Sequence, residues 1–139
     1  MNIGRYLTLI LAALILCVIL TGSARSGAPG WHGNHFPNVI LTTHEGKKVR
    51  FYDDVLKDKV VSINFVYTTC GDVCPLDTAQ LRQVQAELGD RVGKDVFMYS
   101  ISLDPENDTP KALARYMRTF DVGPGWTFLT GSVEDIKLL

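Results

Sequence analysis

Two strongly apolar stretches, Val60–Tyr67 and Val96–Leu103, limit what this chain can fold into more than any other feature. Both are apolar at odd and at even positions, and a strand of that kind is covered on both of its faces. Between them Leu81, Val84 and Leu88 repeat at helical spacing. This alternation predicts an α/β fold with parallel neighbouring strands and helical crossovers, in which Val60–Tyr67 is a central strand.

Turn and cap signals predict the remaining elements. Val39–Thr42 and Lys48–Phe51 flank a Gly-containing turn and are typical of a hairpin. Thr109 followed by Pro110 predicts the start of a helix, and Trp126–Thr130 predicts a third strand. The other predicted boundaries are Pro75 and Gly89 for the first helix, and the capping pair Ser132 and Asp135 for a last helix.

The N-terminus has the pattern of a targeting segment. Arg5 precedes an uninterrupted apolar run over residues 6–20, and Gly22 and Ala24 then have the spacing that an export peptidase prefers. Residues 1–24 are therefore predicted to be a signal peptide or a membrane anchor, and both alternatives stay open. Residues 25–35 are predicted to be a flexible tether, and residues 36–139 the folded domain. Either alternative predicts an inner-membrane-anchored or secreted protein whose soluble domain lies in the periplasm or an equivalent exported compartment.

The charge of the chain excludes one class of partner. The 139 residues include 14 Lys and Arg against 15 Asp and Glu, and the formal net charge is −1. The charges are spread along the chain without the basic stripe that nucleic-acid binding requires. We therefore expect a membrane contact through the N-terminal segment and no nucleic-acid partner.

Cys70 and Cys74 are the residues most suited to chemistry. They follow an apolar strand and come directly before Pro75, at the predicted start of a helix. Helix N-termini stabilise thiolates, and this spacing allows the two sulfurs to form a disulfide or to converge on one soft metal ion. A bond across so short a loop constrains the unfolded chain very little, so a purely structural disulfide is disfavoured. Cys17 is interpreted as a small apolar residue of the leader.

Several short segments together resemble a known family. They are Phe36-Pro-Asn-Val39, Leu41-Thr-Thr43, Asn64-Phe-Val-Tyr-Thr-Thr-Cys-Gly-Asp-Val-Cys-Pro75, Ser100-Ile-Ser-Leu-Asp-Pro-Glu-Asn-Asp-Thr109 and Phe128-Leu-Thr-Gly131. This set is similar to the Sco/SenC family of exported copper proteins. The resemblance implies a thioredoxin-like fold with an N-terminal β-hairpin and a membrane segment. It also implies copper ligation by Cys70 and Cys74, and a redox-active Cys70–Cys74 disulfide.

The chain departs from the family pattern at the third copper ligand. The family's histidine ligand lies on a later hairpin, whereas His32, His35 and His44 all precede the cysteines. We expect the C-terminal hairpin and helix to be missing, so that residues 36–139 are a partial domain from a fragmentary gene model or a truncated reading frame. The alternative is a short variant with another third ligand. His32 and His35 are interpreted as solvated tether residues and His44 as a turn residue, so Cu(I) is the expected ion. Cu(II) would need nitrogen ligands.

Three carboxylates and the choice of function remain to be interpreted. Asp104 and Asp108 are interpreted as turn and cap residues rather than catalytic groups, and Asp72 as a solvated residue. The resemblance implies a metallochaperone that assists assembly of the copper site of cytochrome c oxidase, with the oxidase copper-site subunit or other copper proteins as partners. A thiol-disulfide oxidoreductase that keeps the oxidase cysteines reduced is the second hypothesis. A redox or copper sensor is the third.

Overall fold

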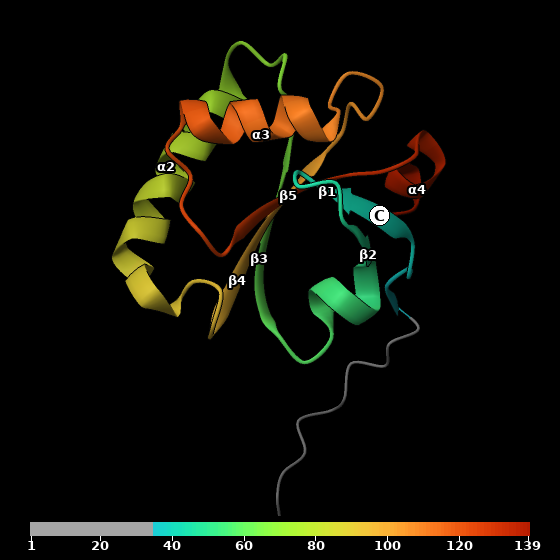
Figure 1. Ribbon diagram of the computed structural model, residues 1–139, viewed down its shortest axis with the longest axis horizontal. Helices are drawn as coiled ribbons and strands as arrows, with labels where there is room; N and C mark the ends of the chain where they lie inside the picture. The colour runs from blue at the N-terminus through green and yellow to red at the C-terminus, as the bar shows by residue number, and fades with distance from the viewer. Residues whose placement is uncertain (1–34) are drawn as a thin grey trace, which may run out of the picture. The chain divides into compact units, whose positions relative to one another are not determined.

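The computed structural model describes residues 35–139, which are organised around one mixed five-stranded sheet (Figure 1). Its strands are β1 (Ile40–Thr43), β2 (Lys48–Arg50), β3 (Val60–Val66), β4 (Val96–Ser102) and β5 (Trp126–Thr130). The spatial order is β2-β1-β5-β4-β3. Strands β3, β4 and β5 run parallel, and β1 is antiparallel to both β2 and β5. The predicted α/β class and the N-terminal hairpin are confirmed.

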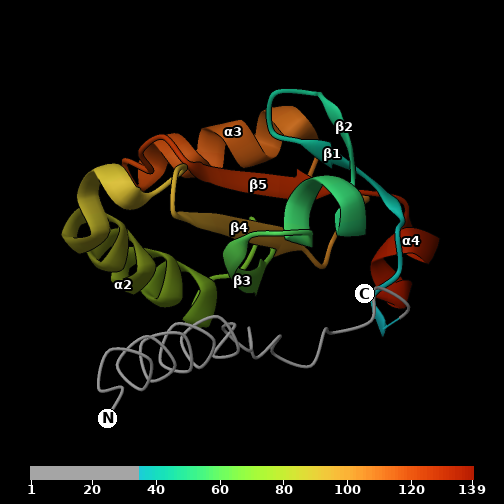
Figure 2. The ribbon, with the colours of Figure 1, turned by 90° about the horizontal axis from the view of Figure 1, so that it is seen from below.

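Helices cover both faces of this sheet (Figures 1 and 2). One face packs against α2 (Val73–Leu88) and α3 (Pro110–Thr119). The other face packs against a π-helical segment, Phe51–Leu56, and α4 (Val133–Leu138). The segment Phe51–Leu56 was not predicted, because six residues between two strands are too few to show a helical period.

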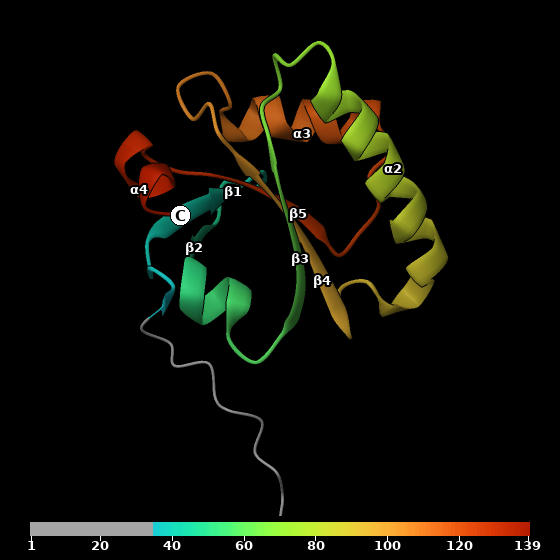
Figure 3. The same cartoon turned by 180° about the vertical axis from the view of Figure 1, so that it is seen from behind.

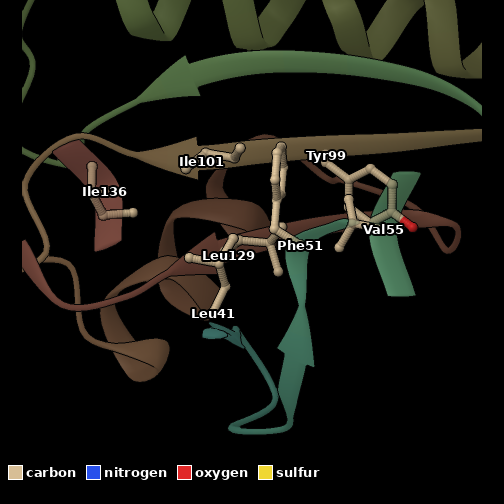
Figure 4. Close-up of a cluster of buried hydrophobic side chains, with 7 residues drawn as sticks. All are labelled: Leu41, Phe51, Val55, Tyr99, Ile101, Leu129 and Ile136. Carbon is tan, nitrogen blue, oxygen red and sulfur yellow. The ribbon is translucent and has the colours of Figure 1, made fainter. Parts of the chain in front are cut away.

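Each face of the sheet has its own apolar cluster. The cluster beside the π-helical segment and α4 consists of Leu41, Phe51, Val55, Tyr99, Ile101, Leu129 and Ile136 (Figure 4). The cluster beneath α2 and α3 consists of Val66, Met98, Leu113, Tyr116, Met117, Trp126 and Phe128. Strands β4 and β5 contribute to both clusters, because successive side chains of a strand point to opposite faces. The two strands are therefore the centre of the folded domain.

Local cap signals gave accurate helix boundaries. The Thr109 hydroxyl accepts the Ala112 N–H at 3.3 Å and caps α3. Ser132 caps α4 in the same way, accepting the Asp135 N–H at 3.0 Å. Gly89 follows the last residue of α2 with a φ of 54°, a conformation that favours glycine. Helix α2 differs from the prediction at its start, because it begins at Val73 rather than Pro75 and so includes Cys74.

The predicted central position of Val60–Tyr67 is wrong. Within the described residues β3 pairs with β4 alone and forms an edge of the sheet, as Figure 3 shows. Val60 is 66% exposed and Phe65 is 48% exposed. An apolar pattern on both faces reports the composition of a strand and not its place in the sheet, so the sequence could not distinguish β3 from β4.

The predicted leader, residues 1–24, and most of the predicted tether lie outside the described residues. From residue 35 onwards, the structure has no helix whose length and apolar character suit a membrane span.

Candidate functional site

The two cysteines lie at the end of the sheet where β3, β4 and β5 have their carboxyl ends. The loop that leads from β3 to α2 and the loop that leads from β4 to α3 lie at this same end, at the top of Figure 1. In open α/β sheets this is where ligands bind, because the loops there are free to carry functional groups. Parallel pairing of β3 and β4 thus brings residues 67–72 and residues 103–109 to one place.

The Cys70 sulfur accepts a hydrogen bond at the start of α2. The Cys70 N–H donates to the Tyr67 carbonyl at 3.2 Å, which closes a tight turn between them. Its Sγ accepts the Cys74 N–H at 3.4 Å. Asp72 is the N-cap residue, but its side chain makes no capping hydrogen bond. The Cys70 sulfur therefore satisfies a backbone donor that would otherwise have no partner at the helix N-terminus.

This position favours the thiolate form of Cys70. Hydrogen bonds lower its pKa to about 6, first from the Cys74 thiol, then from the backbone N–H groups of Cys74 and Asp72, with a smaller contribution from the Tyr67 hydroxyl. Hydrogen bonds to the charged form stabilise that form. Cys70 is only half-buried. At neutral pH it is therefore a thiolate that a metal ion or another protein is able to reach.

Cys74 has the opposite character. Its pKa is raised, first by burial and then by the neighbouring Cys70 sulfur. Its side chain packs against the cluster beneath α2 and α3. Its carbonyl accepts the Thr78 hydroxyl at 2.7 Å, and that hydroxyl lies 3.0 Å from the Tyr116 hydroxyl. The site thus combines a thiolate at Cys70, just before α2, with a thiol at Cys74 in the first turn of α2, and both side chains are half-buried.

Asp108 holds the loop before Cys70 in place. The sequence predicted only a turn or cap role for this residue. Its carboxylate is fully buried and accepts the Thr68 N–H at 3.1 and 3.2 Å and the Thr68 hydroxyl at 2.5 Å. It also accepts the Ser102 hydroxyl at 2.6 Å. Asp104 is the turn residue of this loop, as predicted, since its carboxylate accepts the Asn107 side-chain amide at 3.0 and 3.1 Å. No local sequence signal links Asp108 with Thr68, because 40 residues separate them.

The histidines do not join the cysteines in the described part of the chain. His44 lies in the turn between β1 and β2, as predicted, and its Nδ1 accepts the Phe128 N–H at 3.3 Å. His35 is exposed, and His32 lies outside the described residues. Across residues 35–139, His, Cys, Asp and Glu side chains form no group of three or more that could hold a metal ion. Within that range the candidate ligands are the sulfurs of Cys70 and Cys74.

Comparison with known proteins gives one consistent result. A model of the SCO1/SenC family matches residues 32–139. The SCO1 protein homolog of Bacillus subtilis is 36% identical over 88 residues, which are 63% of this chain and 44% of that protein. The structure of Bradyrhizobium japonicum ScoI with copper bound is 36% identical, with a TM-score of 0.63, and the match covers 71% of this chain and 60% of that one.

A third relative adds thiol chemistry to this comparison. The structure of BsSco, described as a member of the Sco family of cytochrome c oxidase assembly proteins with a disulfide switch, is 34% identical with a TM-score of 0.60. That match covers 70% of this chain and 57% of the BsSco chain. The present chain spans less than half of the B. subtilis relative, at 44%. The family resemblance of the short motifs, and the mixed sheet with helices that it implied, are confirmed.

Proposed function

Because the chain belongs to the SCO1/SenC family, we propose that it is a copper metallochaperone that carries Cu(I) on Cys70 and Cys74 to the copper site of cytochrome c oxidase. The observation that carries this proposal is the thiol pair at the N-terminus of α2, in which hydrogen bonds lower the pKa of Cys70 to about 6. The copper-bound ScoI structure and the description of BsSco as an oxidase assembly protein support the choice of cargo and partner.

The donor set fits Cu(I) as a cargo. Thiolates are soft ligands that select Cu(I), whereas a structural zinc site requires four ligands. A metal ligand must be deprotonated, and Cys70 already is at neutral pH. Because Cys70 is only half-buried, an acceptor thiol has access to a copper ion bound there. A site with few ligands at a surface suits transfer better than permanent storage.

A titration with Cu(I) tests this proposal. The full chain, reduced and kept without oxygen, competes for Cu(I) with a colorimetric Cu(I) chelator, and we expect about one bound ion per chain. The double variant Cys70→Ala/Cys74→Ala should lose this binding. Cys17→Ala is the matched control, since it removes one thiol and leaves the pair intact, and it should bind as the wild type does. Stoichiometric binding by the double variant would contradict the proposed site.

The asymmetry of the two thiols supports a second candidate, thiol-disulfide exchange. The Cys70 thiolate attacks one sulfur of a partner disulfide, which forms a mixed disulfide and releases the other partner sulfur as a thiolate. Cys74 then loses its proton and attacks the Cys70 sulfur. This step closes the Cys70–Cys74 disulfide and releases the second partner thiolate. The partner gains two electrons, and the chain loses them.

One pair of mixing experiments separates the candidates. In the first, the copper-loaded chain is mixed with the reduced, metal-free copper-site domain of the oxidase subunit. A chaperone transfers copper while Cys70 and Cys74 stay reduced. In the second, the metal-free, reduced chain is mixed with the same domain in its disulfide form. A reductase becomes oxidised as the domain gains thiols, and a sensor does neither.

We also propose that residues 1–24 export the domain, either as a cleaved signal peptide or as a membrane anchor. The support is the single early cation followed by an apolar run and small residues. A fusion of alkaline phosphatase, which is active only outside the bacterial cytoplasm, to the C-terminus of the chain tests this. Phosphatase activity that depends on residues 1–24 is expected, and its absence would contradict export. Separation of membrane and soluble fractions then distinguishes an anchor from a cleaved signal.

A further inference from the structure

Asp108 has a buried carboxylate whose hydrogen bonds all go to residues outside its own loop. It is 0% exposed, and both of its oxygens accept hydrogen bonds, from the Thr68 N–H, the Thr68 hydroxyl and the Ser102 hydroxyl. None of the ion pairs among residues 35–139 includes Asp108. Burial of a carboxylate is costly unless hydrogen bonds compensate for the lost water, so these bonds hold their partners firmly.

Neither the cap of α3 nor the turn of its own loop requires the Asp108 side chain. Helix α3 is capped by Thr109, which accepts the Ala112 N–H, and the turn of the loop is held by Asp104. The Asp108 backbone N–H donates to the Asp104 carbonyl at 2.8 Å, which needs no carboxylate. The side chain therefore serves the contact with Thr68 on one side and Ser102 on the other.

The contact with Thr68 leads directly to the thiol pair. Thr68 lies within the turn that the hydrogen bond from the Cys70 N–H to the Tyr67 carbonyl closes. The direction in which this turn leaves β3 fixes where the Cys70 sulfur meets the Cys74 N–H. Ser102, at the end of β4, holds Asp108 from the centre of the sheet. A chain of contacts thus runs from the buried strand β4 through Asp108 and Thr68 to Cys70.

We propose that Asp108 is a positioning residue for Cys70: its carboxylate fixes the Thr68 backbone and hydroxyl and thereby keeps the Cys70 sulfur in line with the Cys74 N–H and the Cys74 thiol. The expected effect on copper affinity rests on the proposed copper function. The effect on the reactivity of Cys70 holds whether or not copper is the cargo.

Four single variants test this role in the full chain. Asp108→Asn keeps the volume of the side chain and removes one acceptor oxygen. Thr68→Val removes only the hydroxyl, and Thr68→Ser restores it. Ser100→Ala is the matched control, because Ser100 is also 0% exposed on β4 and also links strands. Its hydroxyl donates to Asn64 Oδ1 at 2.7 Å and accepts the Trp126 Nε1–H at 2.9 Å, and neither partner lies in residues 67–72.

Three measurements are made on each variant. The first is the rate at which iodoacetamide alkylates Cys70 at pH 7, followed by mass spectrometry of the peptides. The second is the affinity for Cu(I) by competition with a chelator, and the third is the midpoint of thermal unfolding. Asp108→Asn and Thr68→Val each weaken or remove a hydrogen bond from Thr68 to the Asp108 carboxylate. This loss should slow alkylation and weaken Cu(I) binding about fivefold or more. Thr68→Ser should restore both, and Ser100→Ala should lower the midpoint alone.

The results separate positioning from general stability. The proposal is overturned if Asp108→Asn and Thr68→Val lower the unfolding midpoint as Ser100→Ala does while Cys70 keeps its wild-type alkylation rate. If Asp108→Asn does not fold, Thr68→Val decides the matter, since it removes a single hydroxyl. If the wild type binds no Cu(I), the copper function fails, and the alkylation rates still decide the role of Asp108.

Discussion

Strands β3 and β4 are neighbours of equal length that differ in burial. They pair in parallel along their whole length, so that Phe65 lies opposite Ile101. Met98–Ser102 of β4 are all buried, whereas in β3 only Val66 is. The loops that follow them are both mostly exposed, but they differ in the residue that each contributes to the site. Residues 67–72 are largely exposed and carry Cys70, and residues 103–109 contain the fully buried Asp108.

Because of this difference, the reactive thiolate lies on the loop after β3 and its rigid support comes from β4. A thiolate that exchanges a metal ion or attacks a disulfide must be accessible, and an edge strand with an open loop provides that access. Such a loop has few contacts of its own to fix its shape. The rigidity comes from the buried strand beside it, through Ser102, Asp108 and Thr68. The comparison predicts that changes in β4 act on stability and changes in the β3 loop act on the thiols.

The largest expected effect is on stability, in the pair Ile101 and Phe65. Ile101→Ala removes a side chain that is 0% exposed and should lower the free energy of unfolding by about 2–5 kcal/mol. Phe65→Ala, opposite it on β3, removes a side chain that is 48% exposed and should cost about 1 kcal/mol or less. Chemical denaturation of the full chain measures both. Equal losses would mean that β3 is buried in solution as β4 is.

The pH dependence of copper binding should reflect the different pKa values of Cys70 and Cys74. Between the Cys70 pKa of about 6 and the raised pKa of Cys74, Cys70 has already lost its proton and Cys74 has kept it. Binding by two thiolates then releases about one proton, so Cu(I) affinity should rise about tenfold per pH unit between pH 7 and 8. Below pH 6 both thiols are protonated, and the slope should approach two protons. A slope of two protons across the whole range would contradict the lowered pKa of Cys70.

The smallest expected effect is in Tyr67, on the open loop. Its hydroxyl is the last of the hydrogen-bond donors that lower the Cys70 pKa, and its own pKa is raised in return, first by that hydrogen bond. Tyr67→Phe removes the hydroxyl and keeps the ring, so the Cys70 pKa should rise slightly while the unfolding midpoint stays the same. Thiolate absorbance in the ultraviolet as a function of pH measures this. An unchanged titration would show that the backbone N–H groups suffice.

The sequence predicted the features that are local and missed those that depend on the sheet. Thr109 and Ser132 gave their caps correctly, because a cap involves residues three positions apart. The position of Cys70 and Cys74 at a helix N-terminus followed from a strand, two thiols and a proline in succession. The edge position of β3 depends on which strands pair, and the contact between Thr68 and Asp108 joins residues 40 apart. Neither leaves a pattern in a single sequence.

The most direct test of the proposed copper site is X-ray absorption spectroscopy at the copper edge on the Cu(I)-loaded full chain. It counts the sulfur atoms bound to the metal. Two sulfur ligands are expected in the wild type and in Cys17→Ala, and none in Cys70→Ala/Cys74→Ala. Copper bound through nitrogen and oxygen alone in the wild type, or a sulfur count that survives loss of both cysteines, would contradict the account.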